Sequence, residues 1–130
     1  MTSRARAWAP AIVWAAIIFA LSSRPTLPAD LGGGLDKVAH FGAYAVLGAL
    51  LAHGAIAWGL RIGWPLVLGL AYAASDEFHQ SFVPGRHSDV ADWLADALGV
   101  AAGCLFMYRR RAWRQESASD ERAPADPAHR

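Results

Sequence analysis

The sequence predicts an all-α fold: a four-helix transmembrane bundle with short loops and a disordered C-terminal tail. The chain has 130 residues, enough for one domain, and 55% of them are hydrophobic. Its 12 basic and 11 acidic side chains are unevenly placed, since ten of them lie in residues 109–130. Between Val38 and Ser75 the only formally charged residue is Arg61. A soluble domain would expose more charge than the first 108 residues carry, so the pattern indicates an integral membrane protein.

The first apolar segment covers about residues 7–23 and follows Arg4 and Arg6. It is short for a helix that crosses a hydrocarbon core, which needs ~20 residues. It could also be a cleaved signal peptide, because residues 20–22, Ala-Leu-Ser, form a small-x-small site behind a basic start. Three further apolar segments favour a retained first span. Residues 24–36 contain two Pro and three consecutive Gly and are predicted to be a loop.

The next two apolar segments are predicted to form an antiparallel helical hairpin, because the short turn at residues 59–63 has Gly at both ends. A Pro-Gly pair at residues 84–85 then separates the third segment from the fourth. The expected spans are about residues 37–58, 64–82 and 88–108. Residues 1–108 are therefore the expected membrane domain. Residues 109–130, basic and then rich in Ser, Ala, Asp and Pro, have too little apolar surface to fold alone.

Basic residues near the segment ends predict the orientation. They precede the first span, occupy the turn between the second and third, and follow the fourth: Arg4, Arg6, Arg61, Arg109, Arg110, Arg111 and Arg114. With four spans, all of them lie on one side of the membrane, and the positive-inside rule makes that side the cytoplasm. Both termini are therefore expected in the cytoplasm, with residues 22–37 and 82–88 on the opposite side.

Polar side chains recur at the non-cytoplasmic ends of three predicted helices. They are Asp36, Lys37, His40 and Tyr44 in the second segment, Asp76, His79 and Gln80 in the third, and Asp89, Asp92 and Asp96 in the fourth. Their spacing places most of them on one face of each helix. An ionisable side chain at the bilayer centre costs ~2.5–3.5 kcal/mol, so Asp96 should face the bundle interior. The three helices are thus expected to bring acids, imidazoles and a cation together.

Some of these positions also have structural interpretations. Asp36 and Lys37 could be a helix cap with a snorkelling lysine. Gly99 and Gly103 continue the acidic face of the fourth helix and are expected to allow close helix packing rather than to bind a ligand. Capping does not explain Asp92 or Asp96, because both residues are expected inside the fourth helix.

No metal site, cofactor or catalytic nucleophile is predicted. The side chains that could supply metal ligands are His40, His79, Asp76, Glu77 and Asp92. The sequence nevertheless has neither H-E-x-x-H nor two His at i and i+4. Ser75 and Ser81 lie in no recognisable nucleophile elbow. The net charge of +1, without a basic stripe, argues against a nucleic-acid partner.

Four short motifs occur in order along residues 12–107. They are Leu-Ser-Ser at 21–23, Asp-Lys-Val-Ala-His-Phe at 36–41, Ser-Asp-Glu-Phe-His-Gln at 75–80, and Pro-Gly-Arg at 84–86 followed by Asp92, Asp96 and Gly99. In this order and placement the chain resembles the VanZ-like family of small bacterial membrane proteins, named for an accessory protein of glycopeptide-resistance clusters associated with teicoplanin resistance.

The resemblance implies a multi-pass protein of the bacterial cytoplasmic membrane. The recurring polar positions of the family correspond here to Asp36, Lys37, His40, Asp76, Glu77, Gln80, Arg86 and Asp92. Asp96 departs from the pattern, since many relatives have Asn there, and the change adds a carboxyl to an acidic site. Together these nine residues are the candidate binding residues.

Three functions fit these observations. In the first, Lys37 and Arg86 hold an anionic lipid headgroup or the phosphate of a cell-envelope precursor, in an accessory or resistance role. In the second, an intramembrane enzyme acts on a lipid-linked substrate, with His40 as base and Asp76 or Glu77 as acid. In the third, the chain is a structural subunit of a homo-oligomer or of another membrane complex. The binding or accessory function is favoured.

Overall fold

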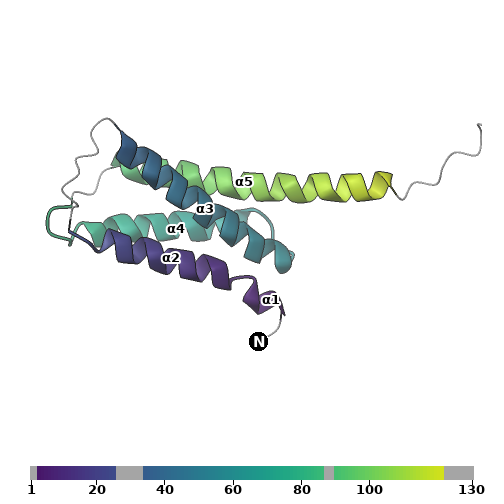
Figure 1. Ribbon diagram of the computed structural model, residues 1–130, viewed down its shortest axis with the longest axis horizontal. Helices are drawn as coiled ribbons and strands as arrows, with labels where there is room; N and C mark the ends of the chain where they lie inside the picture. Colours follow the sequence, from purple (N-terminus) through teal and green to yellow (C-terminus); the bar gives the residue numbers. More distant parts are fainter. Residues whose placement is uncertain (1–2, 26–33, 87–89, 122–130) are drawn as a thin grey trace, which may run out of the picture.

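Helices joined by loops make up the described part of the chain, with no strand among these residues. The computed structural model describes residues 3–25, 34–86 and 90–121. The helices are α1 (Ser3–Arg6), α2 (Ala9–Ser22), α3 (Leu35–Ala57), α4 (Gly63–Gln80) and α5 (Val90–Asp120) (Figure 1). Because α1 is a single turn ahead of α2, the bundle has four long helices. The predicted all-α bundle is confirmed.

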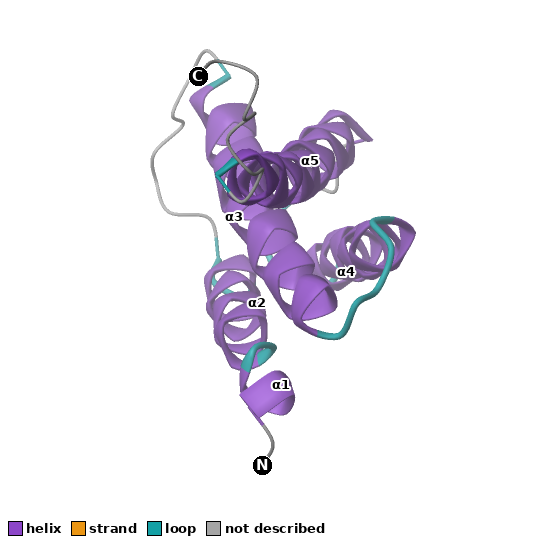
Figure 2. Ribbon diagram, turned by 90° about the vertical axis from the view of Figure 1, so that its right-hand side faces the viewer, coloured by secondary structure: helices purple, strands orange, loops and turns teal. Residues whose placement is uncertain are grey.

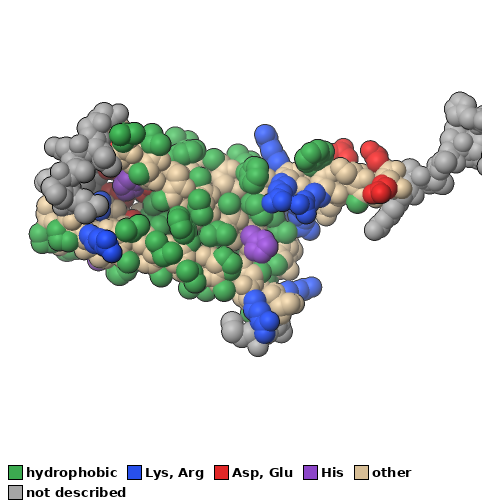
Figure 3. All heavy atoms as spheres, viewed as in Figure 1, with side chains coloured by type: hydrophobic (Ala, Val, Ile, Leu, Met, Phe, Trp, Pro, Cys, Tyr) green, Lys and Arg blue, Asp and Glu red, His purple; other side chains and the backbone are tan. Residues whose placement is uncertain are grey.

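Three of the four long helices are built to cross a membrane. The described residues contain three stretches long and apolar enough to do so: Ser3–Ser22, Leu35–Ala57 and Val90–Asp120. Large apolar side chains are exposed around the bundle, including Ile12 at 67%, Val67 at 62% and Phe106 at 61%. Figure 3 shows such side chains covering the middle of the visible face. An apolar exterior of this kind suits a hydrocarbon solvent. α4 is less apolar because its last turns are polar.

The last helix is longer than the sequence pattern suggests. A span ending near residue 108 and a disordered tail from residue 109 were the expectation, but α5 continues to Asp120. Residues 109–120 are therefore helical, which corrects the prediction for this part of the tail. The physical reason is that Arg, Ala, Gln and Glu are good helix formers, and extending an existing helix avoids the cost of nucleation. Residues 122–130 lie outside the described part of the chain.

Glycines bring α3 and α5 into backbone contact. A Cβ atom at Gly99 would collide with the carbonyl group of Phe41, and one at Gly103 with that of Ala45. Both glycines lie on α5 and both carbonyls on α3, so only residues without a side chain fit this interface. The predicted packing role of Gly99 and Gly103 is confirmed. It brings the start of α5 close to the start of α3.

α3 contacts each of the other long helices. Figure 2, which looks along the bundle, shows α2, α4 and α5 placed around it. α2 is attached by side-chain hydrogen bonds to backbone carbonyls: Trp14 Nε1 donates to Ala43 O of α3 at 2.9 Å, and Tyr72 OH of α4 donates to Ala15 O at 2.6 Å. The C-terminal ends of α2 and α4 and the N-terminal ends of α3 and α5 consequently lie at the same end of the bundle (Figure 1).

Candidate functional site

All buried polar and charged side chains of the described residues lie at that one end. They are Ser22, Asp76, Glu77, Gln80 and Asp96, exposed by 6%, 3%, 8%, 3% and 0%. We refer to these five, together with His40 and Tyr44, as the polar cluster. The helices that carry it run through an otherwise apolar core, in which Leu47, Val100 and Cys104 are almost fully buried. The cluster is therefore a local departure from the apolar packing of the bundle.

Asp76 connects three helices. Ser22 Oγ of α2, Tyr44 OH of α3 and Gln80 Nε2 of α4 donate hydrogen bonds to its Oδ2 atom at 2.9, 2.9 and 3.0 Å. Its other oxygen, Oδ1, is buried and has no hydrogen-bond partner among the described residues. Three donors on one oxygen fix the orientation of this carboxylate. The second oxygen remains able to accept a hydrogen bond from a group outside these residues.

A second buried carboxylate holds the imidazole of the cluster. His40 Nδ1 of α3 lies 3.0 Å from Asp96 Oδ1 of α5. The side chain of Asp96 is 0% exposed and that of His40 is 18% exposed. The prediction that Asp96 faces the bundle interior is confirmed. The contact of Gly99 with the backbone of α3, less than one turn further along α5, places Asp96 at this depth.

Lys37 and Asp92 form an ion pair nearer the surface. Lys37 Nζ lies 2.9 Å from Asp92 Oδ1 and 3.5 Å from Asp36 Oδ2. The side chains of Lys37 and Asp36 are 41% and 52% exposed, whereas that of Asp92 is 16% exposed. The three residues thus form a rim outside the polar cluster, and Lys37 neutralises charge on Asp92 rather than reaching Asp76 or Asp96.

Arg86 lies in the loop after α4 and faces α2. Its Nη2 and Nε atoms donate to the carbonyl oxygens of Leu21 and Arg24, at 3.4 and 3.5 Å. Both bonds are long, and a guanidinium carries five N–H donors. The described contacts of Arg86 therefore leave donors available to a ligand.

A cavity of about 170 Å³ opens beside the cluster, between the ends of α2, α3 and α4. Part of its wall is apolar and comes from Ile18, Leu21, Ala39 and Ala43. The other part is polar and comes from Ser22, His40, Tyr44, Asp76, Gln80 and Arg86. Arg86 is the one formally cationic side chain among these lining residues. The cavity thus combines apolar walls with donors, an acid and a guanidinium.

The structure separates the predicted site residues into three groups. His40, Asp76, Gln80 and Arg86 line the cavity. Glu77 and Asp96 lie behind His40, with possible metal-ligating atoms of all three within 4.8 Å of one another. Asp36, Lys37 and Asp92 form the rim.

His79 and Ser22 show the limits of helical spacing as a guide. His79 lies outside the cluster, where Ser23 Oγ is 3.0 Å from its Nε2. The ring centroids of His79 and Phe19 are 4.6 Å apart, with the ring planes tilted by 31°. Ser22 belongs to the cluster, although its only signal in the sequence is the motif that closes the first span. Tyr44 shares the helix face of His40, and that spacing is the signal that identifies it.

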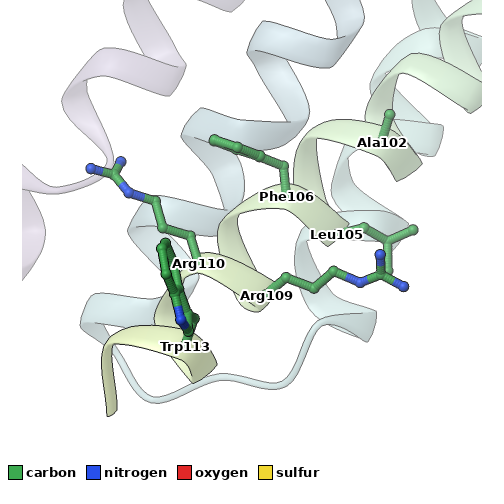
Figure 4. Close-up of a pocket in the computed structure, with 6 residues that line it drawn as sticks. All are labelled: Ala102, Leu105, Phe106, Arg109, Arg110 and Trp113. Atoms are coloured by element: carbon green, nitrogen blue, oxygen red, sulfur yellow. The ribbon is translucent and has the colours of Figure 1, made fainter. Parts of the chain in front are cut away.

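A second hollow, of about 590 Å³, lies against the other half of α5 (Figure 4). Its lining residues all come from that helix: Ala102, Leu105, Phe106, Arg109, Arg110 and Trp113. A surface provided by one helix has no opposing wall to hold a ligand. This hollow contains no residue of the polar cluster, so the candidate site is the cavity between α2, α3 and α4.

Comparison with known proteins agrees with the fold. No curated protein and no solved structure gives a significant match. The family model VanZ/LLP1 matches residues 7–112, which contain α2, α3 and α4 complete and most of α5. The matched range also contains every residue of the cluster and its rim. A match over this share of the chain, together with the apolar helices, shows that this membrane protein belongs to the VanZ/LLP1 family.

Proposed function

We propose that the chain binds an anionic headgroup of a membrane lipid, or of a lipid-linked cell-envelope precursor, in the cavity between α2, α3 and α4. The observation that carries this proposal is the composition of the cavity wall. A guanidinium and other donors lie directly beside apolar side chains of the helices. An amphiphile needs this combination, because its headgroup requires polar partners while its chain remains in hydrocarbon.

Arg86 is the residue proposed to hold the anion. Its planar fork can donate two parallel hydrogen bonds to one phosphate, which a lysine cannot do. Of the other cations at this end, Lys37 is already paired with Asp92 at 2.9 Å, and Arg24 is not among the residues that line the cavity. We therefore assign Lys37 to the rim and Arg86 to the ligand.

Asp76 restricts which headgroups fit. Its buried Oδ1 atom has no hydrogen-bond partner among the described residues, and a carboxylate only accepts hydrogen bonds. A headgroup that is anionic throughout would be repelled here. The favoured ligand carries a phosphate and, a few ångströms away, a donor such as a hydroxyl or an amino group.

The arrangement of charge supports an extracytoplasmic cavity. Arg4, Arg6 and Arg61 lie on α1 and in the α3–α4 turn, away from the cavity, and Trp58 Nε1 bonds to the carbonyl oxygen of Arg4. Arg109, Arg110, Arg111 and Arg114 lie on the far half of α5, where Figure 3 shows Lys and Arg side chains in blue. Under the positive-inside rule, this basic end faces the cytoplasm. We propose four crossings of the bacterial cytoplasmic membrane, with both termini inside.

Lipid binding to the purified protein tests the proposal. Native mass spectrometry of the detergent-solubilised chain would be used with phosphatidylglycerol, a polyprenyl phosphosugar and uncharged diacylglycerol as probes. We expect the two phosphates to bind and diacylglycerol not to bind. Arg86→Gln should weaken phosphate binding about tenfold or more, because a hydrogen bond to a charged group contributes about 1.5–3 kcal/mol.

Arg61→Gln is the matched control, because it removes the same charge at the opposite end of the bundle. It should bind the phosphates like the unchanged protein. Equal affinity in the unchanged protein and in Arg86→Gln would overturn the proposal, as would diacylglycerol binding as tightly as the phosphates.

A second function is favoured by one contact. A buried carboxylate that holds the Nδ1 atom of an imidazole, as Asp96 holds His40, is the arrangement that orients a general base. On this alternative, the chain is an acid–base enzyme acting on a lipid-linked substrate. Incubating labelled polyprenyl phosphate lipids with the purified protein would then give a product, and His40→Gln would abolish it.

A further inference from the structure

One imidazole and two carboxylates meet behind the cavity, each from a different helix. His40 belongs to α3, Glu77 to α4 and Asp96 to α5. Atoms of these side chains that can ligate a metal all lie within 4.8 Å of one another. Glu77 is 8% exposed and Asp96 is 0% exposed. We infer that these three residues form a binding site for a divalent transition-metal ion, of the kind represented by Mn²⁺ or Zn²⁺.

The orphaned oxygen of Asp96 is an independent observation for this site. Asp96 Oδ2 is buried and has no hydrogen-bond partner among the described residues, while Oδ1 faces His40. An unsatisfied buried polar atom costs ~1–3 kcal/mol, and more when its group is charged. In folded proteins such a group is paired or coordinates a metal. A cation beside Asp96 supplies the missing partner.

The charge of the neighbourhood also favours a cation. Two carboxylates that approach each other this closely in a buried place repel each other. The partner described for Asp96 is an imidazole, which carries at most one positive charge. Lys37, the one lysine of the sequence, pairs with Asp92 at the rim. A divalent ion would offset both carboxylates.

The distances and the donor set define the class of ion. Ligand atoms lie about 2.0–2.2 Å from a bound Zn²⁺, so two ligand atoms of a tetrahedral site are about 3.4 Å apart. The three possible ligand atoms lie within 4.8 Å of one another. Small side-chain movements would therefore bring them to the separations that a bound ion needs. Imidazole favours Zn²⁺, Fe²⁺ and their neighbours, whereas a purely carboxylate set would favour Mg²⁺ or Ca²⁺. Three protein ligands also leave one coordination position open.

Sequence motifs did not reveal this site, because they report ligands spaced along one helix. The prediction of no metal site followed from the absence of such a motif, whereas these three ligands come from three helices. His40 lies in both the cluster and the cavity wall, so a bound ion would lie beside the proposed headgroup. The inference goes beyond headgroup binding and does not depend on it, since the ligands are all from the protein.

The test uses Mn²⁺ alone, without lipid. The untagged, EDTA-treated protein in detergent would be titrated with Mn²⁺ and followed by electron paramagnetic resonance. We expect saturable binding of one ion per chain, with a nitrogen coupling from the imidazole of His40. Zn²⁺ should compete for the site, and a similar concentration of Mg²⁺ should not.

Variants locate the ion. His40→Gln should remove the nitrogen coupling and weaken Mn²⁺ binding at least tenfold, and Asp96→Asn should weaken it to a similar degree. His53→Gln is the matched control, because His53 is an exposed histidine of the same helix, and it should behave like the unchanged protein. If Asp96→Asn does not fold, the unchanged protein and His40→Gln still decide the question.

Two results would overturn the metal site: no saturable Mn²⁺ or Zn²⁺ binding to the unchanged protein, or unaltered affinity and nitrogen coupling in His40→Gln. Lipid binding is measured separately and depends on Arg86. Phosphate lipids that bind a chain without metal affinity would therefore remove only the metal site. A chain that binds Mn²⁺ at His40 but does not bind phosphate lipids would contradict only the proposed function.

Discussion

Asp76 offers the sharpest test of how the site is held together. Its Oδ2 atom accepts hydrogen bonds from Ser22, Tyr44 and Gln80, and the first two bonds cross between helices. Interhelical hydrogen bonds in membrane proteins contribute about 0.6 kcal/mol on average and up to about 1.7 kcal/mol. The upper part of that range applies, because the acceptor is a carboxylate and Asp76 is 3% exposed. Asp76→Ala should therefore lower the free energy of unfolding by about 3 kcal/mol.

Asp76→Asn should lose about half as much, since it keeps one acceptor oxygen. The free energy of unfolding would be measured by denaturant titration in mixed micelles. A double-mutant cycle of Asp76→Ala with Tyr44→Phe should give a coupling of about 1 kcal/mol. The control is Ser75→Ala, because the Ser75 hydroxyl is exposed and bonds only to the carbonyl of Tyr72 in its own helix. It should change stability by less than about 0.5 kcal/mol. A stable Asp76→Ala variant, or a coupling of zero, would refute the reasoning.

Three more predictions follow from the packing, the rim and the orientation. Gly103→Ala should lower the free energy of unfolding by several kcal/mol in the same titration, because the added Cβ would collide with an α3 carbonyl. The control Gly42→Ala places its Cβ in open space and should gain up to about 1 kcal/mol from helix propensity. Equal effects of the two substitutions would contradict the α3–α5 contact. A double-mutant cycle of Lys37→Met with Asp92→Asn should give a coupling free energy of no more than about 1 kcal/mol, because the lysine side chain is 41% exposed. A coupling of several kcal/mol would show a buried ion pair instead. A reporter active only in the periplasm should be silent when fused after Arg130, and strong activity would reverse the proposed orientation.

Hydrophobic spacing was sufficient to predict the helices and their order. It also placed the polar residues at one end, because an antiparallel arrangement of alternating helices brings such ends together. Asp96 could be predicted to face inward from its depth in the helix, since lipid exposure there is costly. The end of α5 was missed, because loss of hydrophobicity ends a membrane span but does not end a helix.

Contacts between helices could not be predicted from spacing. Whether His40 meets Asp96 or Asp92 depends on the rotation of α5, which is fixed by Gly99 and Gly103 against α3. A difference of one residue turns a helix by about 100° and would bring a different side chain to the cluster. Arg86 lies in the loop after α4, which helical spacing does not describe, so the sequence did not show its contacts with the end of α2.

The central claim, that the cavity between α2, α3 and α4 binds an anionic amphiphile, is tested most directly by crosslinking. A polyprenyl phosphosugar with a diazirine in the isoprenoid unit next to the phosphate would be photoactivated with the purified protein, and the modified residues identified by mass spectrometry. We predict modification concentrated on the apolar cavity wall at Ile18, Leu21, Ala39 and Ala43, and lost when excess unlabelled lipid is added. Modification spread evenly over exposed apolar residues such as Val67 and Phe106 would contradict the claim.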